Sequence, residues 1–340
     1  MKKNKFIKLY FYILDNIISL YLNNPITKSI KLYKINRALT IVDISNVKKL
    51  NIEHFMEKDK VFINNEKEEM NKYLLNFLNI MNKNFDKKDL KNLYDNIVWV
   101  MFKKFNSIKY DGDYDPIENL IRYSNKTNST AIYHELFHLA SNPYNNRNSK
   151  GGFEYNFDNI QFGYGLTEGY TELLNKRYFN SKTEYVYRKE ILICKCIEDI
   201  IGKEKMSSFY LNADLFHFIK ELNNVYTKYE IERFICSVDF IHDYGYKYSL
   251  ADCEIATLYS QEENVIMFLL KGYLNNLINT NYSNEIIEEK IYIYIKELIK
   301  TFEFDIDQYF ISEINNIIYK ILNKNINLNI NLFKERKNML

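Results

Sequence analysis

Residues that interrupt regular secondary structure are scarce in this chain of 340 residues, which contains 3 prolines and 9 glycines. Proline removes a backbone donor and glycine is entropically costly, so both weaken the interior of a helix or strand. Their scarcity favours a mostly helical protein. Hydrophobic residues make up 46% of the chain, which suffices for one large domain or for two to three smaller ones.

Apolar residues recur at helical spacing over much of the chain. The expected helices span residues 66–84, 90–105, 187–202, 205–223, 228–241, 262–280, 284–301 and 306–323. Two short segments, Ala38–Val42 and Ile117–Tyr123, have the character of strands, and a turn-like segment at Asp111–Pro116 precedes the second. The pattern predicts a mainly α fold with a small β-sheet, in the α+β class.

The charge balance and the cysteine content limit which binding partners and which cellular compartment we expect for this protein. The 46 Lys and Arg nearly balance the 44 Asp and Glu, so no long-range field favours nucleic acid or an anionic membrane. No apolar run reaches about 18 residues, so we expect no transmembrane helix. The four cysteines fit neither a C-x-x-C pair nor a dense disulfide framework. Asp15 and Asn16 interrupt the apolar run Leu9–Leu20, which makes a signal peptide a poor fit. We expect a cytoplasmic protein.

The motif with the most chemical content is H-E-x-x-H at His134, Glu135 and His138. On a helix, the two imidazoles lie on one face about one turn apart and can share a metal ion. With 5 histidines and 44 acidic residues, the motif arises by chance in about 0.01 of chains of this composition. Pro143 marks the expected end of the helix. An apolar stripe would hold this helix in a core, at Ile132, Leu136 and Leu139.

Catalytic zinc commonly takes three protein ligands, so the motif needs a third. The extended H-E-x-x-H-x-x-G-x-x-H pattern is excluded, because Ser141 and Tyr144 occupy the Gly and final His positions. A cysteine ligand ahead of the motif is also excluded, since the first cysteine is Cys194. Glu168 and Glu172 remain, spaced i and i+4 on another expected helix, and either can be the ligand.

The motif at residues 134–138, followed by E-G-x-x-E at residues 168–172, resembles the gluzincin clan of zinc peptidases. The resemblance implies that Glu168 is the third zinc ligand and that Glu172 accepts a hydrogen bond from a ligand imidazole. It also implies a gluzincin-like catalytic domain followed by a helical bundle. The expected regions are an N-terminal α+β region at 1–110, a zinc-binding catalytic core at 111–185 and a helical C-terminal region at 186–340. No G-x-M-x-N signature precedes the motif, which argues against an aminopeptidase.

Zinc chemistry assigns a role to Glu135. Next to a ligand, its carboxylate can act as general base on a water molecule and then pass the proton to the leaving amine. The resemblance implies a further His or Tyr that stabilises the oxyanion, for which His242 is the candidate. Three tyrosines near the metal segment are alternatives: Tyr155, Tyr164 and Tyr170. His54 and His217 are interpreted as ordinary packing or surface residues.

Two further features concern the surroundings of the motif. Five of the nine glycines fall between Asn145 and Glu172, which indicates backbone that needs positive φ or close approach. The segment Ile117–Tyr123 lies just before the motif helix, where gluzincin-like enzymes place an edge strand. We therefore expect this segment to bind extended peptide by strand addition.

The leading hypothesis is a zinc endopeptidase that acts on a peptide or protein substrate. An alternative is a helical binding or scaffold protein with a structural or vestigial zinc site. Glu135 favours the first, because a structural site has no need of a general base. A third hypothesis, a secreted protease, requires a mature N-terminus beyond Leu20.

Overall fold

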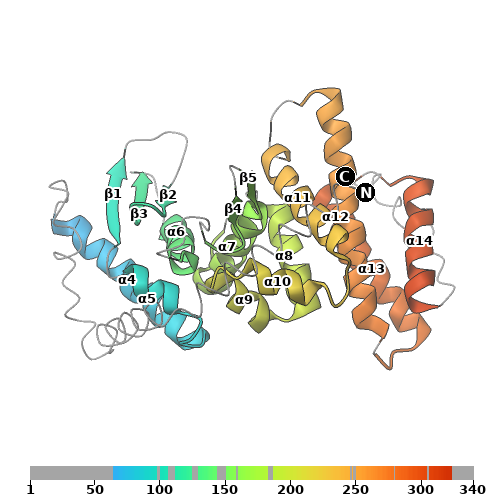
Figure 1. The fold of residues 1–340 in the computed structure, drawn as a ribbon, viewed down its shortest axis with the longest axis horizontal. Coiled ribbons are helices and arrows are strands. Elements are labelled where there is room, and N and C mark those ends of the chain that lie inside the picture. The colour runs from blue at the N-terminus through green and yellow to red at the C-terminus, as the bar shows by residue number, and fades with distance from the viewer. Residues whose placement is uncertain are drawn as a thin grey trace.

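The computed structural model describes residues 64–97, 100–105, 112–124, 129–143, 151–157, 160–182, 187–245, 247, 250–278, 280–304 and 306–323. The expected strand Ala38–Val42 and His54 lie outside these residues. The described part is mostly helical with a small three-stranded sheet, which confirms the expected α+β class. Figure 1 shows the sheet and the first helices at one side, the middle helices in the centre, and the C-terminal helices at the far side.

The expected N-terminal helix is confirmed, whereas the next is shorter than expected. The helices of this part are α4 (Asn64–Asn84), α5 (Lys91–Ile97) and α6 (Ser129–Ser141). The segment expected to continue α5 to residue 105 instead forms strand β1 (Met101–Phe105). Hydrophobic residues at both ends of β1 match a helical as well as an extended pattern, and pairing with a distant strand decides between them.

The sheet has the strand order β1-β3-β2, with β2 at Gly112–Asp115 and β3 at Leu120–Ser124. β1 pairs with β3 in parallel, and β2 pairs with β3 antiparallel. The expected turn at Asp111–Pro116 therefore contains a strand. Across β2 and β3, Arg122 Nε donates to Asp113 Oδ1 at 2.8 Å, so one turn-forming residue has a cross-strand partner.

The predicted role of Ile117–Tyr123 as an edge strand is wrong. The strand in this segment, β3, is the central one, and both of its sides are already paired. Ile121 is fully buried and Leu120 is 5% exposed. Within the part of the chain that the structure describes, β1 and β2 are the outer strands of this sheet.

The described residues between 187 and 323 are helical apart from short connections, as predicted. They are α8 (Arg188–Ile201), α9 (Lys203–Leu211), α10 (Leu215–Leu222), α11 (Lys228–Tyr244), α12 (Asp252–Ile278), α13 (Asn284–Phe302) and α14 (Gln308–Leu322). The single helix expected at 205–223 is two helices, because Ala213 has φ +51 and Asp214 caps α10 by accepting from His217 N–H.

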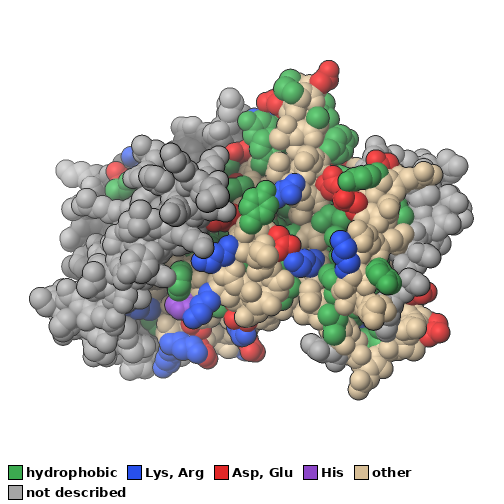
Figure 2. All heavy atoms as spheres, turned by 45° about the vertical axis from the view of Figure 1, so that its right-hand side comes forward, with side chains coloured by type: hydrophobic (Ala, Val, Ile, Leu, Met, Phe, Trp, Pro, Cys, Tyr) green, Lys and Arg blue, Asp and Glu red, His purple; other side chains and the backbone are tan. Residues whose placement is uncertain are grey.

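Helix α12 begins ten residues before its expected start. Its first turns project beyond the neighbouring helices (Figure 1), and exposed hydrophobic side chains such as Ile255 and Tyr259 lie there; green side chains mark the projection in Figure 2. Such exposed turns do not need an apolar stripe, so hydrophobic periodicity does not reveal them. No helix among the described residues is long and apolar enough to cross a membrane.

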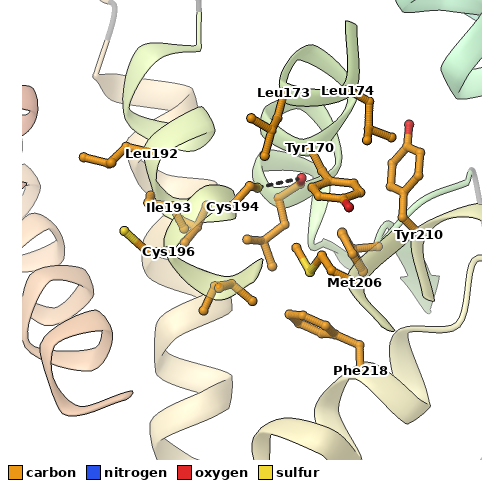
Figure 3. Packing of buried hydrophobic residues seen from close by; sticks show 14 of the residues in the cluster. Tyr170, Leu173, Leu174, Leu192, Ile193, Cys194, Cys196, Met206, Tyr210 and Phe218 are labelled. Carbon is orange, nitrogen blue, oxygen red and sulfur yellow. Dashed lines mark hydrogen bonds between the residues drawn. The ribbon is translucent and has the colours of Figure 1, made fainter. Parts of the chain in front are cut away.

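One hydrophobic core runs through the helices from α4 to α14. Figure 3 shows its central part, where Tyr170, Met206, Tyr210 and Phe218 pack together and Cys194 donates to a backbone carbonyl. The Tyr170 hydroxyl donates to Glu198 Oε1 at 2.7 Å. Arg177 pairs with both oxygens of the same carboxylate, so the buried charge of Glu198 is compensated.

Helix α7 (Tyr164–Phe179) packs so closely on α8 that only glycine fits at position 169. A methyl group there would lie 2.6 Å from Glu190 Cβ and 2.7 Å from its carbonyl carbon and oxygen. The sequence predicted that the clustered glycines allow close approach of the backbone, and Gly169 allows this between α7 and α8. This contact brings the first residues of α8 beside the part of α7 that holds Glu168.

Gly169→Ala is expected to lower the free energy of unfolding by about 1–3 kcal/mol, because backbone atoms of α8 must move. The gain in helix propensity, about 1 kcal/mol, is smaller. Thermal or urea unfolding measures the difference. Glu288→Ala, an exposed position on α13, is the control and should be nearly neutral. An unchanged midpoint for Gly169→Ala would contradict the close packing.

Candidate metal centre

The motif helix α6 is held on its apolar side and at its C-terminus. Its expected stripe is confirmed, since Ile132, Leu136 and Leu139 are all buried. Asn96 of α5 donates from Nδ2 to the carbonyl oxygens of Leu139 at 2.8 Å and Asn142 at 2.7 Å. Backbone acceptors at the helix end are thereby satisfied. The helix ends at Ser141, two residues before Pro143, as predicted.

The second helix, α7, is capped by a residue from a different helix. Its N-cap, Gly163, has φ +80 and offers no side-chain cap. Asp239 of α11 accepts from the backbone N–H of Gly163 at 2.7 Å and of Gly165 at 2.9 Å. A carboxylate at this helix N-terminus also complements the helix dipole. The position of α7 therefore depends on α11 as well as on α8.

These two helices bring His134, His138 and Glu168 together, with one ligand atom from each within 4.8 Å of the others. The two Nε2 atoms lie 3.1 Å apart. Glu168 Oε2 lies 3.2 Å from His134 Nε2, and Glu168 Oε1 lies 3.4 Å from His138 Nε2. Among the residues that the structure describes, this is the group of His, Cys, Asp or Glu with the spacing of a metal site.

The spacing of these atoms fits a tetrahedral zinc ion. Zinc bonds to nitrogen and oxygen of about 2.0–2.1 Å place neighbouring ligand atoms roughly 3.3–3.4 Å apart. The two Nε2 atoms, 3.1 Å apart, lie close to this value, and the Glu168 carboxylate approaches one of them through Oε2 at 3.2 Å and the other through Oε1 at 3.4 Å. Three protein ligands leave a fourth position for water, as in catalytic sites.

The electrostatics of the group favour a cation. Burial lowers the pKa of His134, but hydrogen bonds with Glu168 and Glu172 and nearby carboxylate charges outweigh it and raise the pKa to about 10. Burial also acts to raise the pKa of Glu168, but His138 and His134 hold it well below its ordinary value. A positive charge, from a proton or a metal ion, is thus stabilised between these side chains.

Glu172 lies behind His134 and is 3% exposed. Its Oε2 accepts from Asn175 Nδ2 at 3.0 Å and lies 3.0 Å from His134 Nδ1, while its Oε1 accepts from Ser181 Oγ at 2.6 Å. Both carboxylate oxygens are therefore engaged away from the Nε2 side of His134. This is the arrangement of an outer carboxylate that fixes the tautomer of a ligand histidine.

Glu135 is 8% exposed and lies next to the candidate ligands on α6. Burial raises its pKa above the ordinary value, although the positive charges of His134 and His138 act to lower it. Gly112 of β2 lies opposite: a Cβ at that position would be 3.7 Å from Glu135 Oε1. The glycine thus lets the backbone of β2 lie close to this carboxylate.

Tyr187 at the start of α8 also reaches the centre, and sequence reasoning missed it. Its ring stacks on His134 with centroids 5.9 Å apart, and its hydroxyl lies close enough to Glu168 for the carboxylate charge to act on it. The charge of Glu168 raises the pKa of Tyr187, and burial adds to this effect, so the hydroxyl stays protonated as a donor. Among 30 tyrosines no local pattern distinguishes this one.

His242 contacts Tyr187 and not the candidate ligands. Its ring stacks on Tyr187 at 5.4 Å, and its Nδ1 lies 3.1 Å from the fully buried Glu190. Its role as the oxyanion stabiliser stays a prediction. Burial acts to lower the pKa of His242, but the hydrogen bond and charge of Glu190 raise it.

The three alternative tyrosines have other partners. Tyr170 bonds with Glu198 in the core. Tyr164 donates to Asp239 O at 3.1 Å, and Tyr155 packs on Phe162 with ring centroids 5.8 Å apart. His217 is an exposed residue paired with Asp214, as expected of a surface histidine.

Comparisons with known proteins identify no relative of this chain. No protein-family model matches the chain, and neither a curated protein nor a solved structure matches it.

Proposed function

We propose that this protein is a zinc-dependent peptidase, in which His134, His138 and Glu168 hold the ion and Glu135 is the general base. The observation that carries the proposal is the convergence of two Nε2 atoms and one carboxylate at the spacing of zinc ligands. A buried carboxylate with a raised pKa lies beside them. Two histidines from one helix and a glutamate from the next also support the finer proposal of a gluzincin-like catalytic domain followed by a helical bundle.

Each side chain then has one task. When bound, zinc lowers the pKa of a water molecule and polarises a carbonyl group. Glu135 would accept a proton from a water molecule beside it and deliver that proton to the leaving amine, and its raised pKa suits it to this role. Glu172 keeps the Nδ1 proton of His134 in place, so that Nε2 presents its lone pair to the ion.

Strand β2 supports a peptide as the substrate. It is an outer strand of the sheet, and Gly112 brings its backbone close to Glu135. Within the described residues no strand pairs with its other side, so an extended peptide can add there through backbone hydrogen bonds. We therefore assign peptide binding by strand addition, which the sequence predicted for Ile117–Tyr123, to Gly112–Asp115.

The cysteines support the proposed cytoplasmic location. All four are free thiols, and Cys194 and Cys196 are buried. Unpaired thiols are typical of a reducing compartment.

The test is metal analysis combined with cleavage of a mixed peptide library by the purified full chain. We expect about one zinc per chain, loss of cleavage after chelation and its return when zinc is added. His138→Ala should lose both zinc and cleavage. A wild-type chain without zinc, or cleavage that persists after complete metal removal, would overturn the proposal. Zinc without cleavage would favour the alternative of a binding protein with a structural ion.

A further inference from the structure

Tyr187 has a backbone conformation that costs energy. Its φ is +59° and its ψ is 24°, which is the left-handed region, although it is not a glycine. This conformation is unfavourable for an L-residue, because it brings Cβ close to the following carbonyl oxygen. Such residues persist where surrounding contacts hold them, and they often lie at functional sites. The contacts of the side chain therefore need an explanation beyond local folding.

The side chain of Tyr187 lies between the metal centre and His242. Its ring is nearly parallel to that of His134, at an interplanar angle of 20°, and to that of His242, at 17°. The buried carboxylate of Glu190 lies 3.1 Å from Nδ1 of His242. The hydroxyl group lies near the carboxylate of Glu168, whose charge acts on it. The contacts of Tyr187 thus include two of the three candidate ligands.

We propose that Tyr187 is a positioning residue for the metal, whose hydroxyl orients Glu168 and whose ring limits rotation of His134. This inference rests on the proposed function. A carboxylate that ligates through one oxygen leaves the other available to a hydroxyl donor, and such outer hydrogen bonds raise metal affinity. Glu172 acts on His134 from the Nδ1 edge, and Tyr187 acts on its face. The two supports are independent.

Tyr187→Phe tests the hydroxyl, because it keeps the ring. We expect zinc affinity, measured by chelator competition, to fall by about 10- to 100-fold. The visible spectrum of the Co²⁺-loaded protein should change, because the ligand carboxylate is no longer held. The thermal unfolding midpoint of the metal-free protein should stay at the wild-type value, whereas loss of a purely structural hydroxyl would lower it.

Tyr164→Phe is the matched control. Its ring also packs against His242, at 5.3 Å, but its hydroxyl donates to Asp239 and Asp243, not to a candidate ligand. We expect wild-type zinc affinity and a wild-type Co²⁺ spectrum. Equal zinc affinity in Tyr187→Phe and wild type would overturn the role of Tyr187 and leave the proposed function intact. A wild-type chain that binds no zinc would overturn both.

Discussion

Glu135→Gln is expected to reduce peptide cleavage by about 10²- to 10⁴-fold while zinc content stays at the wild-type level. Glutamine has nearly the same shape as glutamate but cannot take up a proton near neutral pH. The carboxylate is outside the group of three ligand atoms, so its neutralisation leaves that group intact. Burial of Glu135 also means that removing its charge relieves desolvation, so the variant should fold.

Zinc content and cleavage must be measured on the same preparation. Glu118→Gln, at an exposed position in the turn before β3, is the matched control and should leave both unchanged. Wild-type turnover in Glu135→Gln would refute the role of this residue as base. Loss of zinc together with activity would instead place Glu135 among the groups that hold the ion.

The helical parts of the fold and the centre of the site could be predicted because their signals are local. The spacing of His134 and His138 places two imidazoles on one face of a helix wherever that helix packs. The apolar stripe that includes Leu136 predicts which side is buried, and burial follows it. Likewise, Pro143 marks the helix end from sequence alone.

The sheet could not be predicted to the same extent, because strand pairing is not local. The sequence Gly-Asp-Tyr-Asp at Gly112–Asp115 has turn-forming residues, yet it pairs with β3 and Arg122 lies opposite Asp113. Met101–Phe105 becomes a strand through parallel pairing with the same segment. Propensity is a weak guide where the partner strand decides.

The surroundings of the metal centre depend on contacts between helices. Tyr187 reaches Glu168 because Gly169 lets α8 approach α7 closely. Position 187 lies 19 residues beyond Glu168 and shares no spacing with it that a periodic pattern could reveal. The hydrogen-bond partners of Glu172 could not be predicted for the same reason. Ser181 contacts Glu172 because of the path that the chain follows after α7, which no local sequence pattern reveals.

Glu168 and Glu172 are two carboxylates one helical turn apart, and their environments predict different losses on conversion to glutamine. In Glu168→Gln a neutral amide replaces the anionic ligand, so zinc affinity should fall by more than about 100-fold, beyond the range for an outer partner. In Glu172→Gln the ion keeps its three ligands, and the expected loss is about 10- to 100-fold.

The carboxylate of Glu172 has the further task of accepting from three donors, on His134, Asn175 and Ser181. In glutamine an NH₂ group replaces one carboxylate oxygen, so this group must face at least one of the three donors. A buried donor without an acceptor costs about 1–3 kcal/mol, so Glu172→Gln should also destabilise the metal-free protein. Glu168→Gln also removes a stabilising charge from the metal-free chain, because the two histidines hold the pKa of Glu168 well below its ordinary value. Zinc affinity, measured by chelator competition, is therefore the property that distinguishes the two variants. A larger loss of zinc affinity in Glu172→Gln than in Glu168→Gln would reverse the assignment of ligand and support.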